Sequence, residues 1–448
     1  MQEYIYPKFT AEMKNTHTIL IPTMAPIHFT MMKGALECEG YHVKLLTEGG
    51  SEVAQEGLKY VHNDTCYPAL LVIGQFISAL KSGKYDVDHI ALLLTQTGGG
   101  CRASNYIHLL RKALVKAGFP QVPVASLNFS GLERDSGFKL SLSLLRKFLS
   151  SVYYGDELMC LSNQLRPYED NSGSVNALVD KWTAKITGQF YQKRGVSLAD
   201  MKENFTAIAD DFALLPITKT PKVKVGIVGE IYVKYSPLGN NRLESFLQTE
   251  NCEVNMPGLL GFLQYCIFNS AKDIKLYGGS RVTKAVMNTA LRFTTKREQA
   301  MLDALHRHAQ FHAPAVFTVM SKMADGIIGH GAKMGEGWLL TAEMMELVSS
   351  GFENIVCAQP FGCLPNHICG KGMVSKIRTI YPSANITPID YDPGATKVNQ
   401  ENRIKLMLAV ARERLDEQNT PASGSSDLKL PSAVDVHVPS LLPAYANI

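Results

Sequence analysis

The sequence predicts an α/β protein with two Rossmann-like lobes, each built on a parallel sheet, joined by a helical connector. Short apolar runs alternate with amphipathic stretches through residues 18–127, and the alternation resumes at residue 222. Such alternation is typical of βαβ units on a parallel sheet. Long helical patterns replace it in between, and 448 residues suit two or three domains of roughly 150 residues each.

The N-terminal α/β lobe is predicted to span residues 1–132. Its apolar runs are short and rich in Leu, Ile and Val, as in strands that are buried on both faces. In chain order, we expect strands at 18–21, 41–46, 89–94 and 122–127, and helices at 27–39, 67–82 and 105–117.

A helical connector is predicted over residues 133–221, followed by a second α/β lobe over 222–415 that opens on the strand VKVGIV. Further strands are expected at 252–254, 354–357 and 385–389, with helices at 240–249, 371–380 and 396–414. Residues 416–448 are rich in Ser, Pro and Ala and offer too little apolar surface to offset the entropy of ordering, which predicts a mobile tail.

Charge and hydropathy argue against two classes of partner. The chain carries 45 Lys and Arg against 41 Asp and Glu, a net charge of +4 without a long run of like charges, so nucleic acid is not expected as a partner. No stretch of about 18 consecutive apolar residues occurs, and the first residues lack the apolar segment of a signal peptide. We therefore expect a cytoplasmic protein that does not enter a membrane.

Nine cysteines, an odd number, make a disulfide framework an unattractive explanation in a large chain without an export signal. Free thiols, metal ligands or cluster ligands explain them better. Three of them, Cys66, Cys101 and Cys363, fall in loops that leave the carboxyl ends of predicted strands. Functional groups of α/β folds gather at that edge of a sheet.

The surroundings of these three cysteines favour chemistry over packing. Cys66 precedes Pro68 at a predicted helix start, where the helix dipole favours a thiolate. Cys101 follows three glycines and precedes Arg102, a pattern in which backbone amides can converge on an anion. Cys363 lies in a loop constrained by Gly and Pro. The alternative for each is a small buried apolar side chain.

Two other interpretations of these loops are weaker. The glycines Gly98, Gly99 and Gly100 could hold a phosphate, but the segment lacks the Lys-Ser/Thr of a P-loop and the spacing of a dinucleotide fingerprint. Cys357, Cys363 and Cys369 follow neither zinc-site nor ferredoxin spacing.

We expect the remaining cysteines to have mainly packing roles. Cys357 is expected in a strand core and Cys369 is an additional ligand candidate. Apolar contexts predict packing roles for the last four, which are Cys38, Cys160, Cys252 and Cys266.

Six segments together resemble the 2-hydroxyacyl-CoA dehydratase superfamily, in particular the C-terminal dehydratase-like module of large activase-related proteins. Three contain the selected cysteines: NDTCYPA at 63–69, TQTGGGCRASNY at 95–106 and QPFGCLPNH at 359–367. Three more are GEIYVKYSP at 229–237, EGWLLT at 336–341 and IDYDPGA at 389–395. The resemblance covers most of residues 10–415.

The resemblance implies a 4Fe-4S cluster between the lobes, held by Cys66, Cys101 and Cys363, with one iron left open. It also implies an acyl-CoA substrate whose thioester carbonyl meets that iron. A low-potential electron would come from an ATP-dependent activase on another chain, since no ATPase segment is visible here. A homodimer is expected by the same analogy.

The resemblance leaves two alternatives open. Double-cubane relatives reduce small molecules and need further ligands, for which the candidates are Cys38, Cys266, Cys357 and Cys369. A non-enzymatic electron relay or activase scaffold could use the same cluster. Apart from the resemblance, a nucleotide-binding α/β enzyme with structural cysteines remains a further possibility.

Some polar residues are weaker candidates. Arg102 and His330 are possible catalytic residues, as a cation beside an anionic centre and as a proton donor. His62 and His367 lie near the cysteine loops and could ligate iron or donate to sulfide. Turn and helix-cap roles are the preferred interpretation of four others, namely Glu230, Lys234, Asn240 and Asn241.

Overall fold

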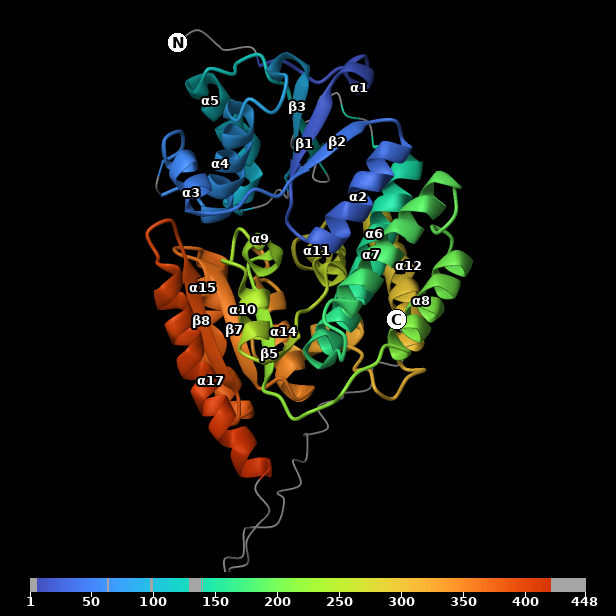
Figure 1. Cartoon of the computed structure of the whole chain (residues 1–448), viewed down its shortest axis with the longest axis vertical. Helices are drawn as coiled ribbons and strands as arrows, with labels where there is room; N and C mark the ends of the chain where they lie inside the picture. Colours follow the sequence, from blue (N-terminus) through green and yellow to red (C-terminus); the bar gives the residue numbers. More distant parts are fainter. Residues whose placement is uncertain (1–5, 63, 97–99, 129–137, 139, 420–448) are drawn as a thin grey trace, which may run out of the picture.

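A computed structural model describes residues 6–62, 64–96, 100–128, 138 and 140–419 of the chain. It contains two four-stranded sheets, and every strand pair in them is parallel. The predicted fold class, two Rossmann-like lobes joined by helices, is confirmed. Figure 1 shows the first lobe in blue, the second in yellow-green to red, and the helical layer beside both.

The first sheet has the strand order β2-β1-β3-β4. Its strands are β1 (Thr18–Pro22), β2 (His42–Leu46), β3 (Ile90–Gln96) and β4 (Val124–Asn128). Its helices are α1 (Met13–Thr16), α2 (Pro26–Cys38), α3 (Ser51–Leu58), α4 (Tyr67–Lys81), η1 (Val87–His89), η2 (Arg102–Asn105) and α5 (Tyr106–Ala117).

Both faces of the first sheet are buried, which explains its apolar strands. Leu20 and Leu92 pack in the core formed with α4 and α5. Ile19 and Leu93 point the other way and pack in the core formed with α2 and the helical layer. Successive residues of a strand alternate between the two faces of a sheet. A strand that is covered on both faces therefore needs apolar residues at most of its positions.

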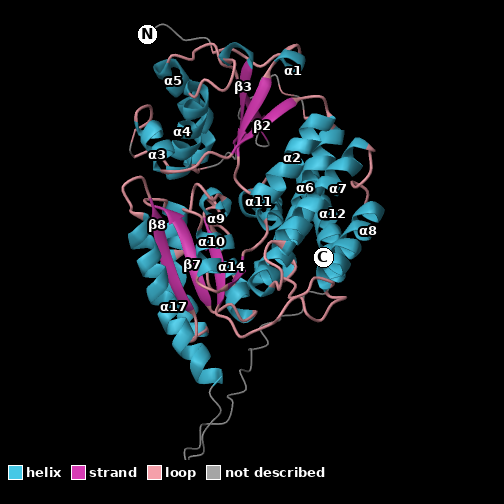
Figure 2. Ribbon diagram, in the orientation of Figure 1, coloured by secondary structure: helices cyan, strands magenta, loops and turns pink. Residues whose placement is uncertain are grey.

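The helical layer consists of α6 (Leu142–Leu165), η3 (Arg166–Tyr168), α7 (Ser174–Tyr191) and α8 (Leu198–Ala213). Ser141 caps α6, and Ser197 forms a capping box with Asp200 at the start of α8. Two later helices, α11 (Leu259–Tyr277) and α12 (Arg281–Leu305), pack against this layer and against each other. The layer therefore combines segments that are far apart in the sequence (Figure 2).

The second sheet has the strand order β6-β5-β7-β8. Its strands are β5 (Lys224–Gly229), β6 (Glu253–Asn255), β7 (Asn354–Pro360) and β8 (Asn385–Tyr391). The remaining helices are α9 (Ile231–Tyr235), α10 (Leu243–Thr249), α13 (Phe317–Met323), α14 (Trp338–Ser349), α15 (Leu364–Cys369), η4 (Lys371–Met373), α16 (Val374–Ile380) and α17 (Lys397–Asn419).

Several details differ from the sequence prediction, and helices α3, α13 and α14 were not expected individually. Helix α17 continues to Asn419, past the predicted start of the tail at residue 416, because Glu and Gln in this stretch are good helix formers. Helix α15 lies where only a constrained loop was expected. Residues 420–448 of the predicted tail lie outside the described residues. Within the described part, no helix combines the length and apolar character that crossing a membrane requires.

Candidate functional site

Three cysteines predicted to act together lie at the starts of helices in both lobes. Cys66 is the N-cap residue of α4, Cys101 of η2 and Cys363 of α15. Cys101 follows β3 and Cys363 follows β7, so each lies beyond the carboxyl end of its sheet. Cys101 and Cys363 are both close enough to Cys66 to raise its pKa. The carboxyl ends of the two sheets thus face each other with the three thiols between them.

Burial dominates the electrostatics of the three thiols. It is the largest cause of a raised pKa at Cys66, Cys101 and Cys363, and it brings Cys363 to about 12. The expected stabilisation of a Cys66 thiolate by the helix start is therefore wrong for the chain without a bound cation. Desolvation of the charged sulfur outweighs the helix dipole.

Each thiol accepts a hydrogen bond from a described residue. The donors are Tyr106 Oη to Cys66 Sγ at 3.2 Å, the Ala103 amide to Cys101 Sγ at 3.5 Å and Asn366 Nδ2 to Cys363 Sγ at 3.3 Å. Donors that point at a sulfur stabilise it as an anion and fix its orientation. The three sulfurs are therefore ready to act as ligands once a cation offsets their charge.

Two carboxyl groups lie beside the thiols. Glu230 caps α9 by accepting from the Val233 amide at 2.8 Å, which confirms its interpretation as a helix cap. Glu336 Oε1 accepts from the Ile231 amide at 2.9 Å, and its Oε2 accepts from Asn366 Nδ2 at 3.2 Å. Asn366 thereby connects this carboxyl group to a thiol.

Burial disfavours the charged form of these two carboxyl groups. It is the largest cause of the raised pKa of both, and mutual repulsion adds to it at Glu230, whose pKa rises to about 8. Both carboxyl groups also raise the pKa of Cys101 and Cys363. At neutral pH the site therefore holds at least one acidic proton close to the three thiols.

The turn that presents Glu230 requires a glycine. Gly229 ends β5 with φ +150°, and a Cβ there would lie 1.8 Å from the Ala358 carbonyl oxygen on the neighbouring strand. Only glycine fits both the backbone angle and this close approach. The chain can therefore turn directly from the sheet edge into α9.

A buried ion pair lies behind the carboxyl groups. Lys234 Nζ donates to the carboxylate of Glu343 at 3.0 and 3.3 Å, and both side chains are nearly inaccessible, at 4% and 2% exposure. Lys234 also lowers the pKa of Glu230 and Glu336, against the larger effect of burial. The sequence predicts a turn or cap role for Lys234 and does not predict this ion pair.

The weaker catalytic candidates have contacts of their own. Arg102 is exposed and donates to the backbone oxygen of Asp64, which ties the Cys66 and Cys101 loops together. The His330 ring packs on Trp338 at 4.6 Å, with Nε2 on the Ser321 carbonyl at 3.1 Å. These contacts describe positioning roles, and neither side chain has a described contact with the three thiols.

The two candidate ligand histidines differ in position. His62 is 74% exposed and pairs with Asp64 at 3.3 Å, so it points to solvent. His367 Nδ1 donates to the Cys363 carbonyl oxygen at 2.9 Å, and its Nε2 faces Asp390 at 3.6 Å. His367 therefore holds the Cys363 loop through its backbone.

All nine cysteines lie in the described residues and are free. Cys357 is buried in β7, as expected, and Cys369 is buried at the end of α15. Cys38 ends α2 about 18 Å from the start of that helix, beside Lys147 and Glu39, so it is a poor candidate for a second ligand set. Cys266 is exposed, so its predicted packing role is wrong. Its pKa is nonetheless raised, first by burial of the thiol and then by the nearby Glu336.

An iron-sulfur cluster is the group that the sequence resemblance implies, and the donor set fits it. Thiolates are the preferred ligands of such clusters, and a cationic core would offset the charge that burial disfavours. Asn366 Oδ1 is buried beside Cys363 without a hydrogen-bond partner in the described chain, as expected next to a site for a further group. No three His, Cys, Asp or Glu side chains in the described part are placed to hold a single metal ion. A cube has four metal corners, so its thiolates need not converge on one point.

Comparison with known proteins gives no family for this chain: no protein-family model matches it, and no curated protein matches it. Its sequence resemblance stays a prediction.

Sequence reasoning selected the three cysteines but missed the groups around them. Tyr106, Glu343 and Asn366 were not selected, and Glu336 appears only as the first residue of the segment EGWLLT. Asn366 lies three residues after Cys363, a spacing at which side chains on a helix meet, and this was the available signal. The two loop glycines Gly98 and Gly99 lie outside the described residues.

Proposed function

We propose that this chain is an iron-sulfur enzyme of the 2-hydroxyacyl-CoA dehydratase type. It would take a low-potential electron from an ATP-dependent activase for a dehydration or reduction of an acyl-CoA substrate. The observation that carries the proposal is the meeting of Cys66, Cys101 and Cys363 from two lobes at the facing edges of two parallel sheets. When bound there, a 4Fe-4S cluster supplies one-electron chemistry and an iron open to a substrate oxygen.

The chain's own residues would supply the proton that loss of a hydroxyl group requires. Burial raises the pKa of both Glu230 and Glu336, and that of Glu230 reaches about 8, so a carboxyl group that holds a proton at neutral pH would lie beside the thiols. Asn366 holds the Glu336 carboxyl group and the Cys363 sulfur in a fixed relation. The protonated carboxyl group is thus the general acid of this proposal, and Asn366 is a positioning residue.

The double-cubane alternative needs further ligands, for which Cys266 is an exposed candidate and Cys357 and Cys369 are buried ones. Cys363 is close enough to Cys357 to raise its pKa, so a further thiol does lie behind the first set. Cys357 and Cys369 are buried, at 0% and 3% exposure, and Cys357 packs in an apolar core. That packing favours the single cluster.

Iron and acid-labile sulfide in anaerobically purified protein test the proposal. We expect about four irons per chain, whereas about eight would favour two cubes. Cys66→Ser, Cys101→Ser and Cys363→Ser should each lower the iron content, with circular dichroism showing an intact fold. Cys252→Ser, in the core away from the site, is the matched control. Full iron retention in all three site variants would reject the proposal.

A further inference from the structure

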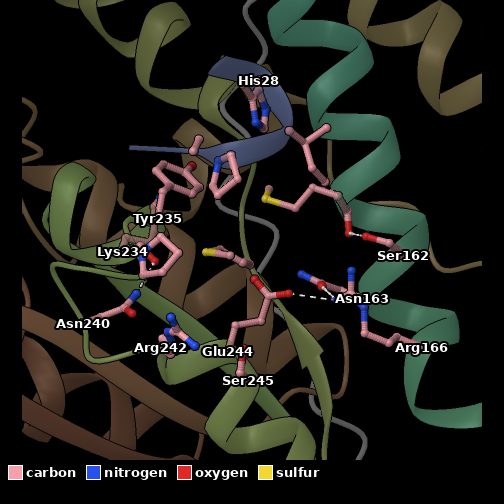
Figure 3. A pocket seen from close by; sticks show the side chains of 16 residues that line it. His28, Ser162, Asn163, Arg166, Lys234, Tyr235, Asn240, Arg242, Glu244 and Ser245 are labelled. Carbon is pink, nitrogen blue, oxygen red and sulfur yellow. Dashed lines mark hydrogen bonds and ion pairs between the residues drawn. The ribbon is translucent and has the colours of Figure 1, made fainter. Parts of the chain in front are cut away.

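A cavity of about 230 Å³ lies where the two lobes and the helical layer meet. Its walls come from the start of α2, from α6 and from the segment that runs from α9 into α10. Figure 3 shows Asn163 and Arg166 reaching in from α6, opposite Lys234, Asn240 and Arg242. The cavity is separate from the thiol site, since none of the three cysteines lines it.

One buried donor in this cavity lacks an acceptor. Asn163 is 2% exposed, and its Oδ1 accepts from Arg166 Nη1 at 3.0 Å. Because a guanidinium can only donate, this bond fixes which end of the amide is oxygen. The Asn163 Nδ2 group therefore faces the other way, and it has no hydrogen-bond partner in the described chain. A buried donor of this kind calls for an acceptor in the cavity.

The charges around the cavity leave one cation unpaired. Arg166 is paired with Glu244 at 2.9 Å, and Lys234 is paired with Glu343. The Arg242 guanidinium is exposed and makes no hydrogen bond or ion pair with a described residue. An anionic ligand would meet both Arg242 and the free Asn163 donor, whereas a cation would meet a carboxylate that is already paired.

Part of the cavity lining is apolar. Met159 and Met256 form this part together with Ile27 and Pro237. Methionine side chains adapt to apolar ligands of varied shape. A dry cavity of roughly 150 Å³ holds benzene, so this cavity has room for a ligand of somewhat more than six heavy atoms.

We propose that this cavity binds a small monocarboxylate, with its carboxylate on Asn163 and Arg242 and a short apolar chain against Met159 and Met256. Coenzyme A is far too large for the space. Lys234, which lines the cavity, lies about one helical turn along α9 from Glu230, and Glu230 is close enough to Cys66 to raise its pKa. The inference does not depend on the proposed iron-sulfur function.

Calorimetric titration of the full chain with hexanoate, hexanamide and inorganic phosphate tests the site. Hexanoate should bind with one molecule per chain. Hexanamide should bind at least tenfold more weakly because it loses a charge-assisted hydrogen bond. Phosphate should also bind at least tenfold more weakly because it has no apolar chain to bury. Arg242→Met should weaken hexanoate binding roughly tenfold to a hundredfold. Arg307→Met, an exposed change at the far end of α12, should leave it unchanged.

Asn163→Leu removes the unpaired donor and should also weaken binding. If Asn163→Leu unfolds, Arg242→Met still tests the site, because replacing an exposed side chain should leave the fold intact. The proposal fails if hexanoate does not saturate the wild type, if hexanamide or phosphate binds equally well, or if Arg242→Met binds as the wild type does.

Discussion

Glu230 and Glu336 accept hydrogen bonds from amides two residues apart at the start of α9, so one short helix holds both carboxyl groups. They come from segments about a hundred residues apart in the chain, and burial raises the pKa of both. Because both carboxyl groups are held by the same helix, their raised pKa values depend on the folded structure of the chain.

The stability of the protein should depend on pH through Glu230. Its pKa rises from 4.5 to about 8 on folding, so the folded chain binds the proton more tightly and the free energy of unfolding falls as pH rises through this window. Glu230→Gln cannot ionise and should gain stability relative to wild type, by a few kcal/mol at about pH 8 and little at about pH 5. Urea unfolding at both pH values measures this.

Glu203→Gln is the control for that experiment, because Glu203 is an exposed carboxylate on α8. It should follow the wild type at both pH values. An equal shift of both variants at both pH values would contradict a raised Glu230 pKa.

Breaking the buried pair of Lys234 and Glu343 should be costly. Lys234→Met leaves a buried carboxylate without its partner, and we expect the free energy of unfolding to fall by about 3 to 5 kcal/mol. The double variant Lys234→Met/Glu343→Leu should recover most of the loss, because two apolar side chains need no partners. Denaturant titration of both variants measures their free energies of unfolding. A double variant that is no more stable than Lys234→Met would contradict a stabilising ion pair between Lys234 and Glu343.

Asn366 should matter for stability as well as for the site. Asn366→Leu removes the donor to Cys363 and to Glu336, and we expect a loss of about 2 kcal/mol because buried acceptors are left unpaired. Asn399→Leu, at an exposed position of α17, should change little. Thermal unfolding measures the melting temperatures of both variants. Similar melting temperatures would contradict a stabilising role for the Asn366 hydrogen bonds.

The glycine before Glu230 should not tolerate a side chain. Gly229→Ala places a Cβ against the Ala358 carbonyl, a backbone atom that cannot move aside, and should cost more than about 3 kcal/mol. Gly188→Ala, in the last turn of α7 with open space around the Cβ, should instead stabilise by up to about 1 kcal/mol. Equal effects on the melting temperature would be inconsistent with this geometry.

The sequence was a good guide to the sheets because both are buried on two faces. Apolar runs such as 18–21 and 225–228 mark strands directly when hardly any position faces water. The edge where parallel strands end also predicted which cysteines meet. The end of α17 was harder, since polar helix formers look the same in a solvated helix and in a loop.

The carboxyl groups of the site could not be predicted for a different reason. A glutamate between glycines, as in the segment around Glu336, is ordinarily solvated. Its burial depends on α9 and Asn366, which reach it from other parts of the chain. Pattern and spacing report neighbours in sequence, whereas these pKa values depend on neighbours in space.

The division of the three thiols between the lobes also limits when the site can form during synthesis. Cys66 and Cys101 emerge from the ribosome early, but Cys363 is made only after some four-fifths of the chain. No group that needs all three can be held by the nascent first lobe. A group that needs all three thiols would therefore be acquired only once most of the chain has been made, and it would have to reach a nearly finished protein.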